Sequence, residues 1–168
     1  MSIDNIIFLL IVGVLFLYII LALVRSLRLV PARMEFIVER FGRYNTTLDA
    51  GFHFLIPFVD RVAFIQDLKE HTMDVPPQTC FTKDEIQVEV DGVIYLQVID
   101  SQKASYGITD FQYASIQLAQ TTTRAIIGTL DLDRTFEERE AISVKVVSVL
   151  DSAAAKWGVK ILRFEIKN

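Results

Sequence analysis

The 168-residue sequence is poor in the residue types that most catalytic and metal sites require. Its one cysteine, Cys80, excludes an internal disulfide and a multi-cysteine metal site. It has two histidines and contains no glycine-rich phosphate loop, no G-x-S-x-G turn and no H-E-x-x-H helix. The net charge of −4 argues against nucleic acid as a partner, because phosphate binding needs a basic face. We therefore predict no catalytic site, no cofactor and no metal ion.

The single cysteine leaves one enzymatic alternative open. Cys80 could act as a nucleophile with His53 or His71, which would make the chain a cofactor-free hydrolase or an accessory subunit. His53 lies between two phenylalanines, and His71 lies among charged residues on a predicted strand. A small buried thiol is the ordinary role for such a cysteine. Thiol labelling distinguishes the two, because a catalytic thiolate reacts at neutral pH and a buried thiol does not.

Apolar residues are in excess near the N-terminus. The hydrophobic fraction is 52% and the mean hydropathy is +0.38, and most of the excess lies in the first two dozen residues. Residues 6–24 contain no charge and no proline. At about 1.5 Å per residue they form a helix of roughly 28 Å, close to the roughly 30 Å of a hydrocarbon core. We predict a transmembrane helix from Ile6 to Val24, with Gly13 and Tyr18 inside the span, after a short extracytoplasmic segment of residues 1–5.

The charges beside this helix predict its orientation. A cleaved signal peptide has a basic segment before the apolar run and a small-residue cleavage site after it. Here Asp4 precedes the run, and Arg25, Arg28 and Arg33 follow it. Because positive residues stay on the cytoplasmic side, we expect a retained single-pass anchor with its N-terminus outside. The rest of the chain then lies on the cytoplasmic side of a bacterial inner (plasma) membrane.

The first part of the domain is predicted to be rich in strands. Expected strands cover residues 35–41, which break at Gly42, then residues 52–56, and then residues 60–72, with Pro76 and Pro77 ending the last. The clearest pattern lies at residues 86–98, where apolar residues occupy the even positions. Alternation over thirteen residues predicts a half-buried strand of roughly 43 Å.

Helices are predicted next. Asp100 and Asp110 are good helix caps, and residues 111–127 form a helix that ends at Gly128. A capping box at residues 135–138 opens a second, longer helix. Its expected core positions are Ile142, Val146, Val149, Leu150 and Ala153.

This second helix ends before Gly158, a left-handed cap. A last strand covers residues 159–167, with Leu162, Phe164 and Ile166 on one face. The order of elements predicts an α+β fold with a sheet-rich first lobe at residues 25–100 and a helix–strand second lobe at residues 101–168.

Several motifs resemble one known family. They are Glu39-Arg40-Phe41-Gly42-Arg43-Tyr44, residues 48–62, Lys83-Asp84-Glu85-Ile86, Leu96-Gln97-Val98-Ile99-Asp100, residues 123–128, Leu132, Arg139-Glu140, Trp157-Gly158-Val159 and residues 163–167. Together they resemble the stomatin/prohibitin/flotillin (SPFH, Band 7, prohibitin homology) domain over nearly all of residues 29–168. The straight anchor is most similar to the bacterial stomatin-like, QmcA-type (paraslipin) branch.

This resemblance implies a non-enzymatic scaffold. Family members assemble into large membrane-bound rings or cages that organise membrane microdomains and regulate membrane proteins or proteases. The implied partners are membrane lipid, further copies of the chain, and an NfeD-type membrane protein or a membrane protease. The family also implies a coiled coil after residue 168, so we expect the sequence to be part of a longer protein.

Two surfaces are candidates for contacts. Residues 51–59 are dense in large apolar side chains and either contact the bilayer or pack partly in the core; the residues are Phe52, Phe54, Leu55, Ile56 and Phe58. For self-association, we expect acidic Glu89 and Asp91 on the long strand to meet basic Arg134 and Arg139 of the next copy.

Overall fold

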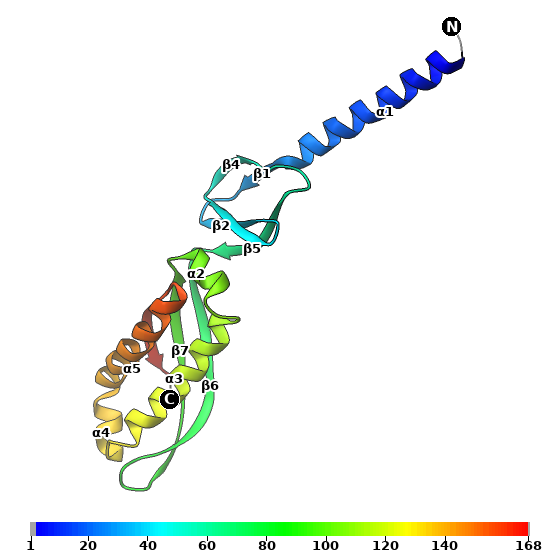
Figure 1. Ribbon diagram of the computed structural model, residues 1–168. Coiled ribbons are helices and arrows are strands. Elements are labelled where there is room, and N and C mark those ends of the chain that lie inside the picture. Colours follow the sequence, from blue (N-terminus) through cyan, green and yellow to red (C-terminus); the bar gives the residue numbers. More distant parts are fainter. Residues whose placement is uncertain (1–2, 168) are drawn as a thin grey trace. The chain divides into compact units, whose positions relative to one another are not determined.

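The computed structural model describes residues 3–167, with side chains from Leu10 onward. The chain forms two compact units, residues 1–65 and residues 66–168 (Figure 1). The sequence placed the change between lobes near residue 100. The long strand predicted at residues 86–98 instead belongs to the same compact unit as the helices. The α+β class is confirmed.

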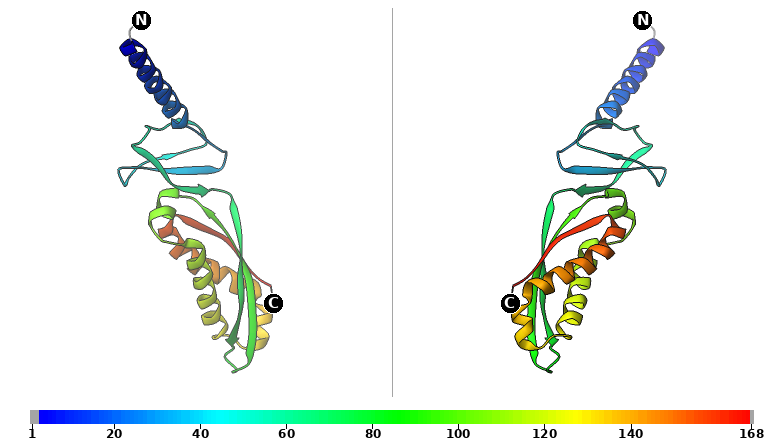
Figure 2. Two further views of the ribbon diagram at one scale, coloured as in Figure 1. Left: turned by 90° about the vertical axis from the view of Figure 1, so that its right-hand side faces the viewer. Right: turned by 90° about the vertical axis from the view of Figure 1, so that its left-hand side faces the viewer.

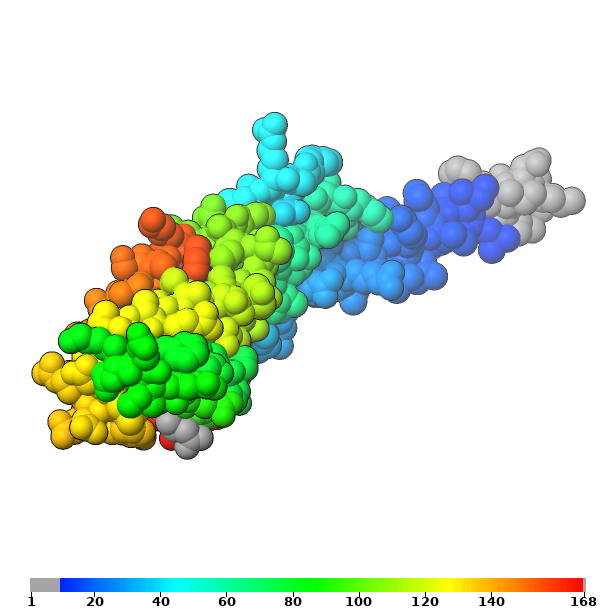
Figure 3. Space-filling model, turned by 90° about the horizontal axis from the view of Figure 1, so that it is seen from below, coloured from blue at the N-terminus to red at the C-terminus, as the bar shows by residue number. Residues whose placement is uncertain are grey.

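The first unit opens with helix α1, Ile3–Ser26, which contains the predicted span of residues 6–24. The helix extends away from the strands of its own unit (Figure 3). In its last turn the Ser26 hydroxyl donates to the Ala22 carbonyl at 2.8 Å. Among the described residues, no helix combines the length and apolar character needed to cross a membrane. Residues 1–2 and the Ile6 side chain, on which two of the predictions fall, lie outside the described part.

Five strands follow in the first unit. Strands β1, Leu27–Val30, and β4, Gly51–Phe54, form a two-stranded antiparallel ribbon. Strands β2, Met34–Arg40, β3, Arg43–Leu48, and β5, Asp60–Asp67, form a sheet in the order β3-β2-β5. Their small core consists of Val30, Val38, Leu48 and Leu55.

The second unit has a three-stranded antiparallel sheet. Strands β6, Glu70–Phe81, β7, Gln87–Val98, and β8, Val159–Ile166, lie in that order, with β7 in the centre. The helices cover one face of this sheet (Figure 2). The alternation predicted along β7 is confirmed, because the even residues from Val90 to Val98 are all buried.

The prediction that Pro76 and Pro77 end a strand is wrong. Residues 60–72 contain the whole of β5 and the start of β6, and β6 continues through both prolines. The register with β7 shifts between Val75 and Gln78. Proline cannot donate to a ladder, but an edge strand with a bulge accommodates it.

Four α-helices occur in the second unit, where the sequence predicted two. They are α2, Ser101–Tyr106, α3, Phe111–Ile127, α4, Leu132–Glu137, and α5, Arg139–Ala154, which is followed by the 3-10 turn η1, Ala155–Trp157. The predicted caps are confirmed: the Asp100 side chain accepts from Lys103 N, and the Asp110 side chain accepts from Tyr113 N.

The predicted capping box is wrong. Thr135 lies inside α4, where its hydroxyl donates to the Asp131 carbonyl at 3.1 Å. The N-cap of α5 is Glu138, which makes no side-chain capping bond. On α5 the buried positions are Ile142, Val146, Leu150 and Ala154, whereas Val149 is exposed and Ala153 is half-buried.

Of two predictions for the last strand and the residue before it, one is confirmed and one is wrong. Gly158 adopts the predicted left-handed conformation, with φ 69° and ψ 25°. Leu162, however, is exposed and does not share the buried face with Phe164. The pairing with β7 shifts at this point, from Leu96 opposite Ile161 to Tyr95 opposite Arg163, so Leu162 is the extra residue of a bulge.

Candidate membrane-contact surface

The ribbon of β1 and β4 carries an uncovered apolar face. Leu27 pairs with Phe54 and Leu29 pairs with Phe52, so all four side chains lie on one face. All four are exposed, Leu29 by 76% and Phe52 by 67%. We call this set of four residues the apolar ribbon face. Large exposed apolar patches mark contact sites, for a partner or for a membrane.

The loop after β4 adds two more exposed apolar side chains. Leu55 is buried in the core of the first unit, whereas Ile56 and Phe58 are exposed. The Phe58 ring stacks on the ring of Tyr18 with centroids 6.2 Å apart. Tyr18 lies eight residues before Ser26, about 12 Å back along the helix axis. The loop therefore reaches back along α1, beside the predicted span.

A buried carboxylate fixes this loop. Arg40 donates to Asp60 from Nε at 2.7 Å and from Nη2 at 3.1 Å. Asp60 also accepts from the Ile56 backbone N–H at 2.9 Å, and its side chain is only 4% exposed. The hydrogen bonds from Arg40 hold the pKa of the Asp60 carboxyl below its usual value and raise the pKa of Arg40. The Asp60 carboxylate thus ties the loop to the end of β2.

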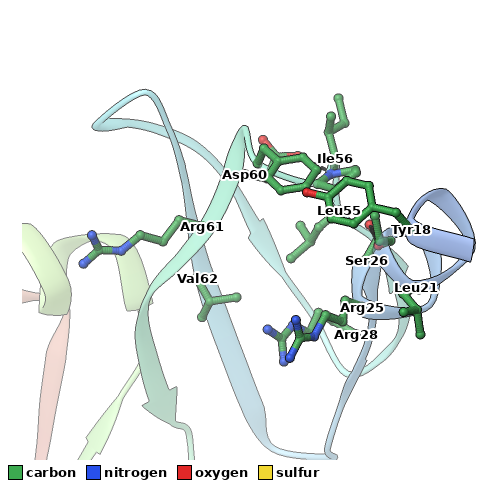
Figure 4. A pocket seen from close by; sticks show the side chains of 13 residues that line it. Tyr18, Leu21, Arg25, Ser26, Arg28, Leu55, Ile56, Asp60, Arg61 and Val62 are labelled. Carbon is green, nitrogen blue, oxygen red and sulfur yellow. Dashed lines mark hydrogen bonds between the residues drawn. The ribbon is translucent and has the colours of Figure 1, made fainter. Parts of the chain in front are cut away.

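The loop and the end of α1 enclose a hollow of about 480 Å³ (Figure 4). Its lining is largely apolar and includes Leu21 and Leu55. Arg25, Arg28 and Arg61 also line it, and none of the three forms an ion pair with a described residue. Figure 4 shows Arg25, Arg28 and Arg61 among the lining residues. Cations beside an apolar surface suit the boundary between lipid tails and headgroups.

The predicted contact residues of segment 51–59 differ in exposure. Phe52, Phe54, Ile56 and Phe58 are exposed and available for contact, and Leu55 belongs to the core. Sequence reasoning missed two members of the apolar ribbon face, Leu27 and Leu29. The sequence shows that leucines 27 and 29 alternate with Arg28, but it does not show the pairing with β4 that places them beside the phenylalanines.

The other residues predicted for the anchor and its flank are exposed. Tyr18, Val24, Arg25, Arg28 and Arg33 all lie on the surface of the first unit. A Cβ on Gly13 would find no atom within 4 Å, so Gly13 marks no packing contact within the described chain.

The four residues predicted for self-association lie in the second unit. Arg134 pairs with Glu138 at 3.0 Å, and the Arg139 guanidinium lies over the Phe136 ring at 5.1 Å. Glu89 is exposed, and Asp91 is half-buried, with an Oδ1 atom that is enclosed and has no hydrogen-bond partner in the described chain. Glu89 and Arg139 line the same small hollow of about 30 Å³. Charges predicted to meet between copies therefore lie near each other within one copy.

Cys80 is fully buried on β6. Burial raises the pKa of its thiol, against a weaker opposing effect of Arg124. His71 lies nine residues earlier on the same strand, roughly 30 Å away at about 3.3 Å per residue. His53 belongs to the first unit, where Nε2 makes a 2.8 Å hydrogen bond with the Asp49 carbonyl. Neither arrangement favours the thiolate that a nucleophile needs.

These features define the class: a mixed α+β domain protein with an apolar N-terminal helix and an uncovered apolar ribbon beside it. The family described as "SPFH domain / Band 7 family" has a model that matches residues 28–168. The chain belongs to this family.

Curated relatives agree with this assignment. The chain is 45% identical over 139 residues to mitochondrial stomatin-like protein 2 of Homo sapiens, covering 83% of this chain and 39% of that protein. It is 41% identical over 139 residues to a stomatin-like protein of Caenorhabditis elegans, covering 83% and 43%. It is also 41% identical over 160 residues to an uncharacterized protein of Methanocaldococcus jannaschii, covering 95% and 78%. The chain thus spans about two fifths of the length of stomatin-like protein 2.

Proposed function

We propose that this chain is the membrane-contacting part of a scaffold that self-assembles into a large ring or cage. Such an assembly would organise a membrane microdomain and regulate membrane proteins or proteases. Membership of the SPFH family supports the scaffold role. An NfeD-type membrane protein and a membrane protease are the partners that the family resemblance implies.

The apolar ribbon face is the observation that carries the proposal. Four large apolar side chains lie on one side of a two-stranded ribbon, and all four remain exposed in the described part of the chain. Burying a leucine or phenylalanine side chain fully contributes about 1.5–3 kcal/mol. Partial insertion of four such side chains is therefore worth several kcal/mol, enough to hold the unit against lipid once an anchor is near.

The anchor and its orientation are part of the proposal. Residues 6–24 form part of a continuous helix and carry no charge. Arg25, Arg28 and Arg33 follow them, which supports a single-pass topology with the domain at the cytoplasmic face of a bacterial inner membrane. The stacking of Phe58 on Tyr18 places an exposed aromatic side chain beside this span.

Tryptophan fluorescence in vesicles tests the membrane contact. We replace Trp157, the one native tryptophan, with Phe and introduce Phe54→Trp on the apolar ribbon face. In vesicles of phosphatidylethanolamine and phosphatidylglycerol, we expect blue-shifted emission that brominated lipid quenches. The parent chain with Trp157 alone, half-buried in the second unit, is the control. Emission from position 54 that stays at the wavelength of tryptophan in water would reject the contact.

A further inference from the structure

The turn between β2 and β3 holds a phenylalanine in an unusual backbone conformation. Phe41 and Gly42 form the two-residue turn, with φ 51° and φ 76°. Positive φ at both central positions is typical of a type I′ turn, where Asn-Gly is the preferred pair. Phe41 is 83% exposed, more than any other large apolar side chain that the structure describes.

Because the Phe41 side chain is mostly exposed, its burial does not offset the cost of its strained backbone conformation. A side chain with a Cβ is disfavoured in the left-handed region, and only asparagine, aspartate and glycine adopt it readily. An apolar ring in water also lacks the gain from burial. Strain of this kind at an exposed position is a feature of functional sites.

A second exposed phenylalanine shares these properties. Phe58 also has a positive φ, 66°, and is 79% exposed. Phe41 follows Arg40 directly, and Phe58 lies two residues before Asp60. The two-point ion pair between Arg40 and Asp60 joins the two segments that carry these phenylalanines, at the end of β2 and the start of β5.

We propose that Phe41 is a further membrane-penetrating side chain, which inserts the β2–β3 turn into the lipid interface in addition to the apolar ribbon face and Phe58. This inference rests on the proposed membrane contact of the first unit. Phe58 lies against Tyr18 of α1, and the ion pair joins Arg40, the residue before Phe41, to Asp60, two residues after Phe58. The ligand is the interfacial zone of a phospholipid bilayer.

The charges around the turn fit this ligand. Arg43 follows the turn, is exposed, and forms no ion pair with a described residue. A cation one residue behind an inserting aromatic ring is placed to meet lipid phosphates. The Arg40–Asp60 pair neutralises two further charges at the base of the turn, where Glu39 also lies.

The test uses the full chain in the same vesicles, with Trp157 replaced by Phe and Phe41→Trp introduced. We expect blue-shifted emission at position 41 and quenching by brominated lipid comparable to that at position 54. Quenching at position 54 without quenching at position 41 would overturn this inference and leave the proposed function intact. An absence of quenching at both positions would reject both. Blue-shifted emission at position 41 that lipid does not quench would assign Phe41 to a contact with another protein chain and overturn the lipid assignment.

A second variant separates function from folding. Phe41→Asn restores the preferred Asn-Gly pair of a type I′ turn, so its melting temperature should equal or exceed that of the parent. Its membrane contact should still weaken, measured as reduced quenching of Phe54→Trp in the same chain. A Phe41→Asn chain with lower thermal stability and unchanged quenching would show that Phe41 serves the fold, which would overturn the proposal.

Discussion

Asp60 joins two segments of the first unit through its side chain. Its carboxylate is almost fully buried and joins β2 to the loop that presents Phe58. The hydrogen bonds from Arg40 lower its pKa in the folded chain. Since the folded pKa lies below the unfolded value, the pair contributes stability above the unfolded pKa of about 4. That contribution is lost as the pH falls through the folded pKa.

We therefore predict that Asp60→Asn lowers the melting temperature of the full chain in detergent by several degrees at pH 7. The difference from the parent should shrink below about pH 4, where the Asp60 carboxyl of the unfolded parent begins to take up a proton, and it should vanish below the lowered pKa of the folded chain. Asp49→Asn is the matched control, because Asp49 is exposed and no ion pair with it is seen among the described residues. An equal loss of stability at every pH would contradict the role given to the ion pair.

Gly158 meets two requirements at once. Its φ of 69° is left-handed, and a Cβ there would lie 2.4 Å from the Asp100 carbonyl oxygen. The Gly158 carbonyl accepts hydrogen bonds from Ile99 N at 2.9 Å and Asp100 N at 3.0 Å. These bonds hold the backbone of Gly158 close to that of Asp100.

We predict that Gly158→Ala reduces the free energy of unfolding by at least about 2 kcal/mol, from backbone strain and steric overlap together. Denaturant titration of the full chain measures it. Ala155→Gly, three residues earlier at an exposed position, is the control and should cost no more than about 1 kcal/mol. An unchanged free energy of unfolding in Gly158→Ala would show that the backbone around residue 158 relaxes without cost.

Local rules succeeded at residues whose partners are close in sequence. Asp100 and Asp110 each accept a hydrogen bond from a backbone N–H three residues later in the helix that they cap, and Gly158 is the C-cap of η1. The rule failed at Thr135 because α4 begins earlier, at Leu132, whose N–H donates to Asp84 at 3.0 Å. That partner lies 48 residues earlier in the chain, and no local pattern points to it.

At the scale of elements, the same contrast appears. The alternation of apolar and polar residues predicted β7, because a strand with one covered face needs an apolar residue at every second position. The pattern could not show the bulges at Pro76-Pro77 and Leu162, which depend on the partner strand. The apolar ribbon face was half predicted for the same reason: β4 was recognised as apolar, but its pairing with β1 follows only from tertiary structure.

The bulge of β6 is tied to α3 by a buried amide. Gln78 donates through Nε2 to the Gln120 carbonyl at 2.8 Å and accepts from Arg124 Nη2 at 2.7 Å. Gln120 donates from its own side chain to the Pro76 carbonyl at 3.2 Å. The proline pair is thus held by side-chain bonds where ladder bonds are missing.

We predict that Gln78→Leu reduces the free energy of unfolding by about 1–3 kcal/mol, because it leaves buried polar groups without partners. Cys80, buried two residues further along β6, reports the change locally. Its labelling by a thiol reagent should be slow in the parent at neutral pH and faster in Gln78→Leu. Gln117→Leu, exposed on α3, should change neither value. Rapid labelling in the parent would instead support the nucleophile alternative for Cys80.

At the scale of the whole molecule, the proposed scaffold needs a contact between copies. Strand β7 offers the exposed Glu89, while Arg134 and Arg139 lie on the α4–α5 segment. Exposed ion pairs contribute only about 0–1 kcal/mol each, so such a contact depends on many repeats. Confinement to a membrane raises the effective concentration of copies and makes weak contacts sufficient.

Asp91 is a poor position for a charge-reversal test, because its enclosed Oδ1 makes a misfolded variant the expected result. Glu89 is suitable because it is exposed, and Glu137→Arg on α4 changes the charge equally at another exposed position. Glu89 also lies near Arg139 within one copy. A melting curve of each variant must therefore show an intact fold before its assembly is compared.

We predict that Glu89→Arg shifts the detergent-extracted protein from a large assembly to smaller species, whereas Glu137→Arg does not. The physical reason is that one reversed charge per copy is repeated at every contact of a ring, so a small penalty is multiplied by the number of subunits. Native mass measurement or electron microscopy in mild detergent records the size. An unchanged large assembly of Glu89→Arg would exclude this strand as the interface and leave the scaffold in place. A monomeric parent chain with its neighbouring segments present would reject the scaffold itself, because a protein that acts through the geometry of many copies cannot act as one.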